Sequence, residues 1–285
     1  MVVSARKIPA DWEPKPAASA DPFRYGWRPK YVHLPNGDFI EQQIPLTLED
    51  LLDPQLGDVI PQGGEHFDYL LLMINVLRDH YEPRQDVYVA GDMKMLWGIP
   101  GLPEPAPDVA VIQGYRPREK PPEYFDVVQE GSRPCLIIEV ASPHDPQVRR
   151  NDYEAKVEIY QRAGIPEYVI LDSSRSSTKD RLLLTGYRLG IGGRYQRIEP
   201  DGDGFLLSET TRLRFGVDQD GKSLAIVDAV TGQRLLQTSK ELKTALQEES
   251  EFRRTAEGRA EAAEAENARL LAELDRLRKG TTTTG

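Results

Sequence analysis

The sequence has one cysteine among its 285 residues, and this scarcity excludes several kinds of site. A single cysteine forms no intrachain disulfide and no zinc site made of several cysteines. Cys135 stands in the apolar run Cys135-Leu-Ile-Ile138, so we expect a small, buried core side chain there. This usage fits a reducing compartment, and we expect a cytoplasmic protein.

Long apolar runs are also missing. No stretch reaches the roughly 18 residues that a transmembrane helix needs, so we expect none. The N-terminal residues have no long apolar core before their prolines, and we therefore expect no secretory signal.

Positive charge is in deficit, with 36 Lys and Arg against 46 Asp and Glu and a net charge of −10. This balance argues against a strong nonspecific nucleic-acid binder, because Lys and Arg supply most of the affinity for phosphates. It does not exclude a nuclease, because acidic metal ligands themselves add negative charge.

Composition divides the chain into four segments. Residues 1–30 are rich in Pro and Ala and predict an extended arm, and residues 31–237 predict one globular domain. Between 238 and 279, steps of three and four residues define a heptad seam that is weak at first, with Glu249 and Arg253, then lined by Ala and finally rich in Leu. This pattern predicts a coiled-coil helix and a homo-oligomer formed through it, and a single solvated helix is the alternative. Residues 280–285 predict a disordered tail.

Two helices are expected before the first strands, and a third helix lies between later strands. Thr47–Leu52 resembles a short helix with Thr47 as its N-cap, and helical spacing of apolar residues predicts a helix from Glu65 to about Tyr81. The third helix begins either at Asp145-Pro146 or at Asn151, and we favour Asn151 because Glu154 would complete a capping box.

In the sequence, the predicted strands follow the second helix and flank the third. Apolar alternation about a Gly-Asp turn predicts a hairpin, a longer loop at 113–134 suggests a lid or rim, and repeated turn signals over 181–236 predict an antiparallel meander. The predicted strands before the meander are Asp86–Ala90 and Met93–Trp97 of the hairpin, Asp108–Ile112, Cys135–Val140 and Glu167–Leu171.

Carboxylates stand at the ends of two of these strands. Asp108 opens one strand, and Glu139 closes the most apolar run of the chain. A buried carboxylate is costly unless it is paired or binds a metal, and two carboxylates on adjacent strands suit a hard cation such as Mg²⁺. The carbonyl of Val140 could be a third ligand. Lys156 on the following helix could position an attacking water and offset phosphate charge.

A set of motifs resembles one bacterial family in a single order. They are Pro107-Asp108-Val-Ala-Val, Leu136-Ile-Ile-Glu139-Val-Ala-Ser142-Pro143, Arg150-Asn-Asp152, Lys156, Tyr160 and Gly164-Ile-Pro-Glu167-Tyr-Val-Ile-Leu-Asp172. Together they resemble the Uma-two family of restriction-endonuclease-like proteins, in the PD-(D/E)xK nuclease superfamily. The match is good over roughly residues 85–237 and poor over the first 60.

The resemblance implies an α/β fold, with a restriction-endonuclease-like mixed sheet flanked by helices, an antiparallel extension and a C-terminal coiled coil. It implies a Mg²⁺- or Mn²⁺-dependent endonuclease acting on DNA, with Asp108 and Glu139 as metal ligands. Ala141 stands where the simple superfamily signature has its lysine, so Lys156 is implied to fill that role.

Several further residues are auxiliary candidates. Glu65 or His66 could complete the site, Asp152 could take part in it or only pair with Lys156 or Arg149, and Arg149 and Arg150 could grip phosphate or only begin a helix. We expect Asp172 to be structural and Tyr160 to be a packing residue. The alternative function is a catalytically inactive nuclease-like module that binds protein or nucleic acid through its coiled coil.

Overall fold

A computed structural model describes residues 21–115, 122–142, 145–173, 182–218, 221, 223–235, 250–255 and 259. The chain divides into two compact units, residues 1–235 and 236–285. Of the second unit, residues 250–255 and 259 are helical. The rest of the expected coiled coil, the expected tail and residues 1–20 of the expected arm lie outside the described residues. No helix among the described residues is long and apolar enough to span a membrane.

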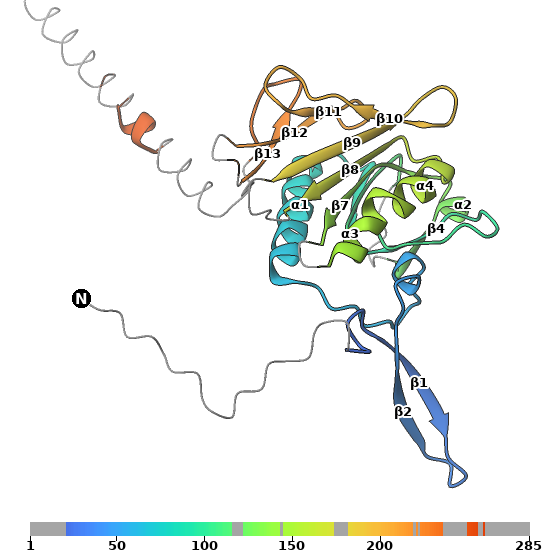
Figure 1. Ribbon diagram of the computed structural model, residues 1–285. Helices are drawn as coiled ribbons and strands as arrows, with labels where there is room; N and C mark the ends of the chain where they lie inside the picture. The colour runs from blue at the N-terminus through green and yellow to red at the C-terminus, as the bar shows by residue number, and fades with distance from the viewer. Residues whose placement is uncertain are drawn as a thin grey trace, which may run out of the picture. The chain divides into compact units, whose positions relative to one another are not determined.

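The first unit has a mixed α/β architecture around a six-stranded sheet (Figure 1). Its helical elements are η2 (Asp50–Leu52), α1 (Gly64–Tyr81), α2 (Val127–Glu130), α3 (Pro146–Tyr153) and α4 (Ala155–Arg162). Its strands are β1 (Trp27–His33), β2 (Phe39–Pro45), β3 (Val87–Gly91), β4 (Lys94–Leu96), β5 (Val109–Gln113), β6 (Tyr124–Asp126), β7 (Pro134–Ala141), β8 (Glu167–Asp172), β9 (Leu183–Leu189), β10 (Tyr195–Ile198), β11 (Leu206–Ser208), β12 (Leu213–Val217) and β13 (Leu224–Asp228).

The six strands follow the order β10-β9-β8-β7-β5-β3. β7 and β8 are parallel, and the other neighbours in this sheet are antiparallel. β7 is central and carries side chains of two separate cores on its two faces. Leu136, Ile138 and Val140 pack with α1, whereas Ile137 and Ala141 pack with α4 and the short strands β4 and β6. An unbroken apolar strand is what a sheet covered on both faces requires, so the expectation for β7 is confirmed.

A two-stranded ribbon, β1 with β2, extends away from this sheet (Figure 1). Residues 27–30, expected in the arm, lie in its first strand. Downstream, β11, β12 and β13 form a separate antiparallel sheet, while β9 and β10 extend the central one. The expected antiparallel meander is therefore found, divided between two sheets.

The expected hairpin between 86–90 and 93–97 is wrong. β3 pairs with β5, whereas β4 leaves the sheet and pairs in parallel with β6. Asp92 causes the separation, because its φ of 46° turns the chain and its amide donates to the carbonyl of Asp108. Alternation in sequence predicted two strands correctly but not their partners.

The favoured helix start at Asn151 is also wrong. Asp145 caps α3, because its Oδ1 accepts from the amides of Gln147 and Val148, and Pro146 occupies the first turn. The helix then breaks at Glu154, whose φ of −123° and ψ of −71° separate α3 from α4. The other alternative, a start at Asp145-Pro146, is the one that the structure adopts.

Candidate functional site

Asp108 and Glu139 meet where two strands of the central sheet run side by side. The β5–β7 register pairs Val109 with Ile138, so Asp108 lies opposite Glu139 and both point to the α4 side of the sheet. The amide of Asp108 donates to Glu139 Oε2 at 3.4 Å. Their exposed fractions are only 7% and 1%. The sheet thus buries two carboxylates in one place, as the sequence pattern indicated.

Lys156 joins this pair from α4. Its Nζ lies 2.9 Å from Glu139 Oε2 and 2.9 Å from Asp152 Oδ1, so one ammonium bridges two carboxylates. Ile159 and Tyr160 anchor α4 in the core and fix the height of Lys156 above the sheet. The structure therefore brings Asp108, Glu139, Lys156 and Asp152 together.

His66 and the backbone of Val140 contact Asp108 from two further directions. His66 Nε2 lies 3.1 Å from Asp108 Oδ1, and the amide of Val140 donates to Asp108 Oδ2 at 2.7 Å. Burial would raise the pKa of Asp108, but these contacts and the nearby Lys156 outweigh it and lower that pKa. His66, on α1, thus belongs to the cluster. Glu65, its neighbour in sequence, is not among the residues that line the cavity at this site.

The cluster carries more negative than positive charge. Three carboxylates (Asp108, Glu139 and Asp152) surround one ammonium, so two negative charges are in excess when His66 is neutral and all three carboxylates are ionised. Burial raises the pKa of Glu139 to about 8, with Lys156 offsetting part of that effect. Burial also raises the pKa of Asp152, and the surrounding carboxylates raise the pKa of Lys156 against its own burial. A divalent cation would neutralise this excess.

A cavity of about 730 Å³ opens onto the cluster. His66, Asp108, Val140, Asp152 and Lys156 form its floor. The opposite wall comes from the N-terminal part of the chain, mainly residues 54–63 with Arg24 and Tyr25. That wall is fastened at the cap of α3, where Arg24 pairs with Asp145 and the Tyr25 hydroxyl donates to Gln147 Oε1. Sequence reasoning missed this wall, because it forms through contacts more than 100 residues apart in the chain.

Arg149 and Arg150 do not line this cavity. Both nitrogens of Arg149 that contact Asp172 lie within 2.8 Å of its Oδ2, and Tyr153 donates to the same oxygen. Arg150 pairs with Glu154 at 2.8 Å. Asp172, with 1% exposed, therefore acts as a structural partner of α3, as expected, and both arginines, which are candidates for a phosphate contact, pair with carboxylates of this chain.

Tyr160 is the residue that sequence reasoning undervalued. It packs in the core as expected, but its hydroxyl also donates to Glu139 Oε1 at 2.5 Å, and it is fully buried. Glu139 is therefore held on one oxygen by Tyr160 and on the other by Lys156. The position of Tyr160 four residues after Lys156, on the same helix face, was the available signal.

The donor chemistry of the site fits a hard divalent cation. Asp108 offers carboxylate oxygens to the cavity, the buried carboxylate of Glu139 lies next to it, and no sulfur ligand is among the described residues that line the cavity. Within the part of the chain that the structure describes, no three His, Cys, Asp or Glu side chains form a ready ligand cluster. A bound ion would therefore draw its remaining ligands from backbone, water or substrate, as Mg²⁺ commonly does.

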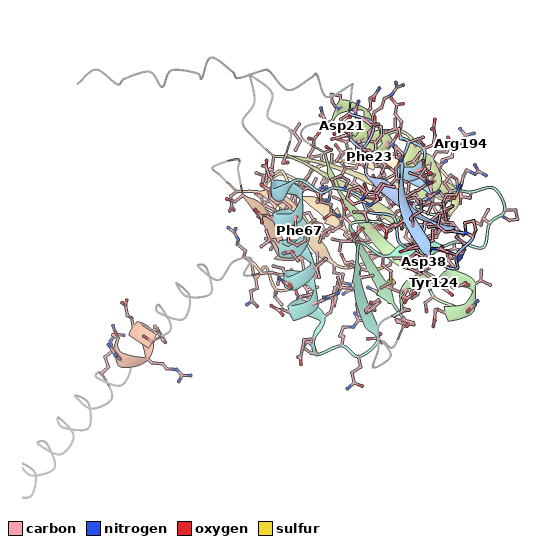
Figure 2. All side chains as sticks on the ribbon, turned by 90° about the horizontal axis from the view of Figure 1, so that it is seen from below. Asp21, Phe23, Asp38, Phe67, Tyr124 and Arg194 are labelled. Carbon is pink, nitrogen blue, oxygen red and sulfur yellow. The ribbon has the colours of Figure 1, made fainter. Side chains whose placement is uncertain are left out.

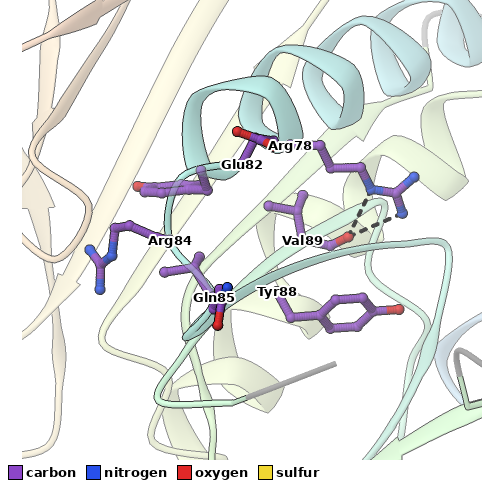
Figure 3. A pocket seen from close by; sticks show the side chains of 8 residues that line it. Arg78, Glu82, Arg84, Gln85, Tyr88 and Val89 are labelled. Atoms are coloured by element: carbon purple, nitrogen blue, oxygen red, sulfur yellow. Dashed lines mark hydrogen bonds between the residues drawn. The ribbon is translucent and has the colours of Figure 1, made fainter. Parts of the chain in front are cut away.

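A second cavity, of about 500 Å³, lies between the end of α1 and β3 (Figure 3). Its arginines are engaged in local contacts, because Arg78 donates twice to the carbonyl of Val89 and Arg84 pairs with Asp86. No pair of buried carboxylates lines it. The candidate site is therefore the larger cavity.

Comparison with known proteins shows the family of the chain. Residues 38–226 match the Uma2 family, described as "Putative restriction endonuclease". Among solved structures, the chain is similar to the "putative nuclease belonging to DUF820 from Anabaena variabilis ATCC 29413", with 16% identity, a TM-score of 0.36, and coverage of 59% of this chain and 76% of that one. None of the curated proteins compared with the chain matches it. Because the family match spans more than half of the sequence, this protein belongs to the Uma2 family of restriction-endonuclease-like proteins.

Proposed function

We propose that this protein is a Mg²⁺- or Mn²⁺-dependent endonuclease that hydrolyses DNA phosphodiester bonds. The observation that carries the proposal is the convergence of Asp108 and Lys156, which line one cavity, with the buried Glu139 that contacts both. Membership of the Uma2 family, described as "Putative restriction endonuclease", supports the same reaction class.

In this proposal Asp108, Glu139 and the carbonyl of Val140 hold the metal. A bound divalent cation would polarise the phosphoryl oxygen and lower the pKa of a coordinated water. Lys156 would donate to the attacking water or to the developing phosphate charge, since Asp152 and Glu139 hold its ammonium at the cavity floor. His66 would fix the orientation of Asp108 through their 3.1 Å contact.

A second candidate function is a catalytically inactive nuclease-like module that binds a partner. One observation favours it: the cavity cations Arg24, Lys94 and Lys156 each pair with a carboxylate. Few positive charges are then available to a phosphate backbone unless metal or substrate displaces those carboxylates. The two candidates differ in one measurable property: only the endonuclease cleaves DNA, and its cleavage depends on a bound metal.

Two variants separate the roles within the site. Glu139→Ala should abolish both metal binding and cleavage while the protein stays folded, because it removes a ligand. Lys156→Ala should abolish cleavage but keep metal binding, because the lysine acts on water and phosphate. Calorimetric titration with Mn²⁺ and cleavage of a labelled DNA duplex measure the two properties. Loss of metal affinity in Lys156→Ala would refute the role assigned to Lys156. If titration of the wild type with Mn²⁺ released or absorbed no heat, the inactive module would be favoured.

A further inference from the structure

Exposed apolar side chains concentrate in the N-terminal part of the first unit. The described residues include seventeen large hydrophobic side chains that are exposed, and eight of them lie between residues 23 and 60. Four of the eight belong to the β1–β2 ribbon: Tyr31, Phe39, Ile40 and Ile44. Figure 2 shows the side chains of this region from below, with Asp38 labelled at the ribbon's turn. Tyr31 and Phe39 lie on one face of the ribbon and Ile40 and Ile44 on the other, so the ribbon exposes apolar side chains on both faces, as a partner-binding element does.

The ribbon also lacks the support that an isolated pair of strands needs. All seven residues of β2 are exposed, and no third strand among the described residues pairs with β1 or β2 along their length. A single two-stranded hairpin is marginally stable in water. A partner that adds strands would supply the missing support.

The charge of the ribbon argues for a protein partner. Residues 27–45 contain two cations, Arg28 and Lys30, and two anions, Asp38 and Glu41, which sum to zero. Arg28 is already bound to Asp58 and Asp50. A ribbon without excess positive charge gains little from a phosphate backbone, so nucleic acid is not the favoured occupant.

The two outer edges of the ribbon differ in their capacity to pair. Hydrogen bonds from Leu34 to Asp38 and from Leu46 to Gly26 fix which residues face inward. Backbone N–H and C=O groups point alternately toward the partner strand and away from it. In β1, the residues whose groups point away include Trp27, which is hydrogen-bonded to Val59, and Pro29, which has no N–H. The outward groups of β2 belong to Phe39, Glu41 and Gln43, which have both N–H and C=O free of a strand partner in the described part of the chain, and to Pro45 at its end, which has no N–H. The edge of β2 is therefore the one open to another strand.

We propose that β2 pairs antiparallel with β2 of a second copy of this chain, about a twofold axis at Gln42. This register places Ile40 opposite the partner's Ile44 and Glu41 opposite the partner's Gln43. The two ribbons would form one four-stranded sheet with a cluster of four isoleucines on one face. A register centred on Glu41 instead would oppose two glutamates and lose the isoleucine pairs, so it is disfavoured. This interface is independent of the proposed catalytic function.

The register predicts which cysteine substitutions cross-link. Gln42 pairs inward with Lys30, so at the twofold axis it forms a non-hydrogen-bonded pair with its symmetry mate, where Cα atoms lie about 4.5 Å apart. That separation is within the range of a disulfide. In the full-length chain, Gln42→Cys should form an intermolecular disulfide at least about tenfold faster than Lys30→Cys, the matched position across the ribbon. The wild type, with Cys135 alone, is the background control.

A second pair of variants tests the isoleucine contact. Adding Ile44→Lys to the Gln42→Cys chain should slow cross-linking about tenfold, because two cross-strand isoleucine pairs are lost. Ile191→Lys, at a fully exposed isoleucine on another turn, should leave the rate unchanged. Equal rates for Gln42→Cys and Lys30→Cys, or no effect of Ile44→Lys, would overturn the pairing. Absence of any disulfide-linked dimer would also overturn it and assign the ribbon to a different partner.

Discussion

Glu139 is the residue on which the proposed site depends most. One carboxylate oxygen accepts from Tyr160, and the other contacts Lys156 and the amide of Asp108. These contacts do not cancel the cost of burying its charge, and burial raises its pKa to about 8. A metal must therefore displace a proton from Glu139 below that pH, so metal affinity should rise as the pH approaches 8.

The raised pKa of Glu139 has a consequence for stability without metal. The folded protein holds a proton that the unfolded chain releases above its ordinary pKa of 4.5, so this contribution to stability is lost as the pH rises from about 4.5 to about 8. Glu139→Gln should remove this loss and exceed the wild type in unfolding free energy by about 1–4 kcal/mol at pH 9, but by little at pH 4. Urea unfolding in EDTA measures both. The same difference at both pH values would contradict the assignment.

Tyr160 offers a second test at the level of single atoms. Its hydroxyl donates to a carboxylate, whereas the Tyr168 hydroxyl donates to the backbone carbonyl of Asp152. Donors to ionised acceptors contribute more, so Tyr160→Phe should cost about 1–3 kcal/mol of unfolding free energy, and more at pH 9 than at pH 5. Tyr168→Phe is the control and should show no such pH dependence. Equal pH profiles for the two variants would argue against the Tyr160–Glu139 contact.

The elements of the fold were predictable where one local signal decided them. The spacing of apolar residues predicted α1, and the apolar runs predicted β5, β7 and β8. Asp108 directly precedes β5 as expected, whereas β7 continues for two residues beyond Glu139, which was expected to close it. Where two local signals competed, the prediction failed. Asp145 and Asn151 were both plausible N-caps in the sequence. The structure uses Asp145 to begin α3, and the break at Glu154 then allows a second helix, α4, to begin just before Lys156.

The long-range parts of the site were beyond sequence patterns. β3 and β4 look like a hairpin, yet their partners are β5 and β6. The wall of the cavity depends on the ion pair of Arg24 with Asp145, two residues separated by 121 positions. A repeating pattern of residue types in the sequence cannot predict a contact at this separation. For this reason, neither Arg24 nor Lys94 was identified from the sequence as lining the site.

Asp145 therefore has two roles that substitution can separate. Asp145→Asn keeps a capping oxygen but loses the ion pair with Arg24, whereas Asp145→Ala loses both. Asp145→Ala should lower the unfolding free energy by about 1–2 kcal/mol, and Asp145→Asn by less. Both should speed trypsin cleavage after Arg24, detected by mass spectrometry. Unchanged cleavage in both variants would show that the ion pair does not hold the cavity wall.

For the whole molecule, two modes of self-association are proposed on separate segments. The heptad pattern over 238–279 predicts one, and the β2 edge of the first unit suggests the other. Deleting residues 240–285 should lower the number of copies per oligomer, calculated from the mass measured by light scattering, because it removes the heptad seam. The Gln42→Cys disulfide should still form in the shortened chain. An unchanged number of copies after the deletion would refute the coiled coil.

The net charge of −10 bears on DNA as the substrate of the whole protein. Cavity cations are paired with carboxylates, so binding of DNA should depend on divalent metal more than on basic surface. We therefore expect DNA binding in EDTA to be weak, and Mg²⁺ or Mn²⁺ to strengthen it by roughly tenfold or more. Fluorescence anisotropy of a labelled duplex with Lys156→Ala, which binds without cutting, measures this. Equal affinity with and without metal would contradict the expectation.

The most direct test of the proposed nuclease activity is nicking of a supercoiled plasmid. Wild-type protein and Glu139→Ala are compared with Mg²⁺ or Mn²⁺, and EDTA serves as the control. We expect metal-dependent conversion to open circles by the wild type and none by the variant or in EDTA. No nicking by the wild type, or equal nicking by the variant, would contradict a metal-dependent nuclease centred on Asp108, Glu139 and Lys156.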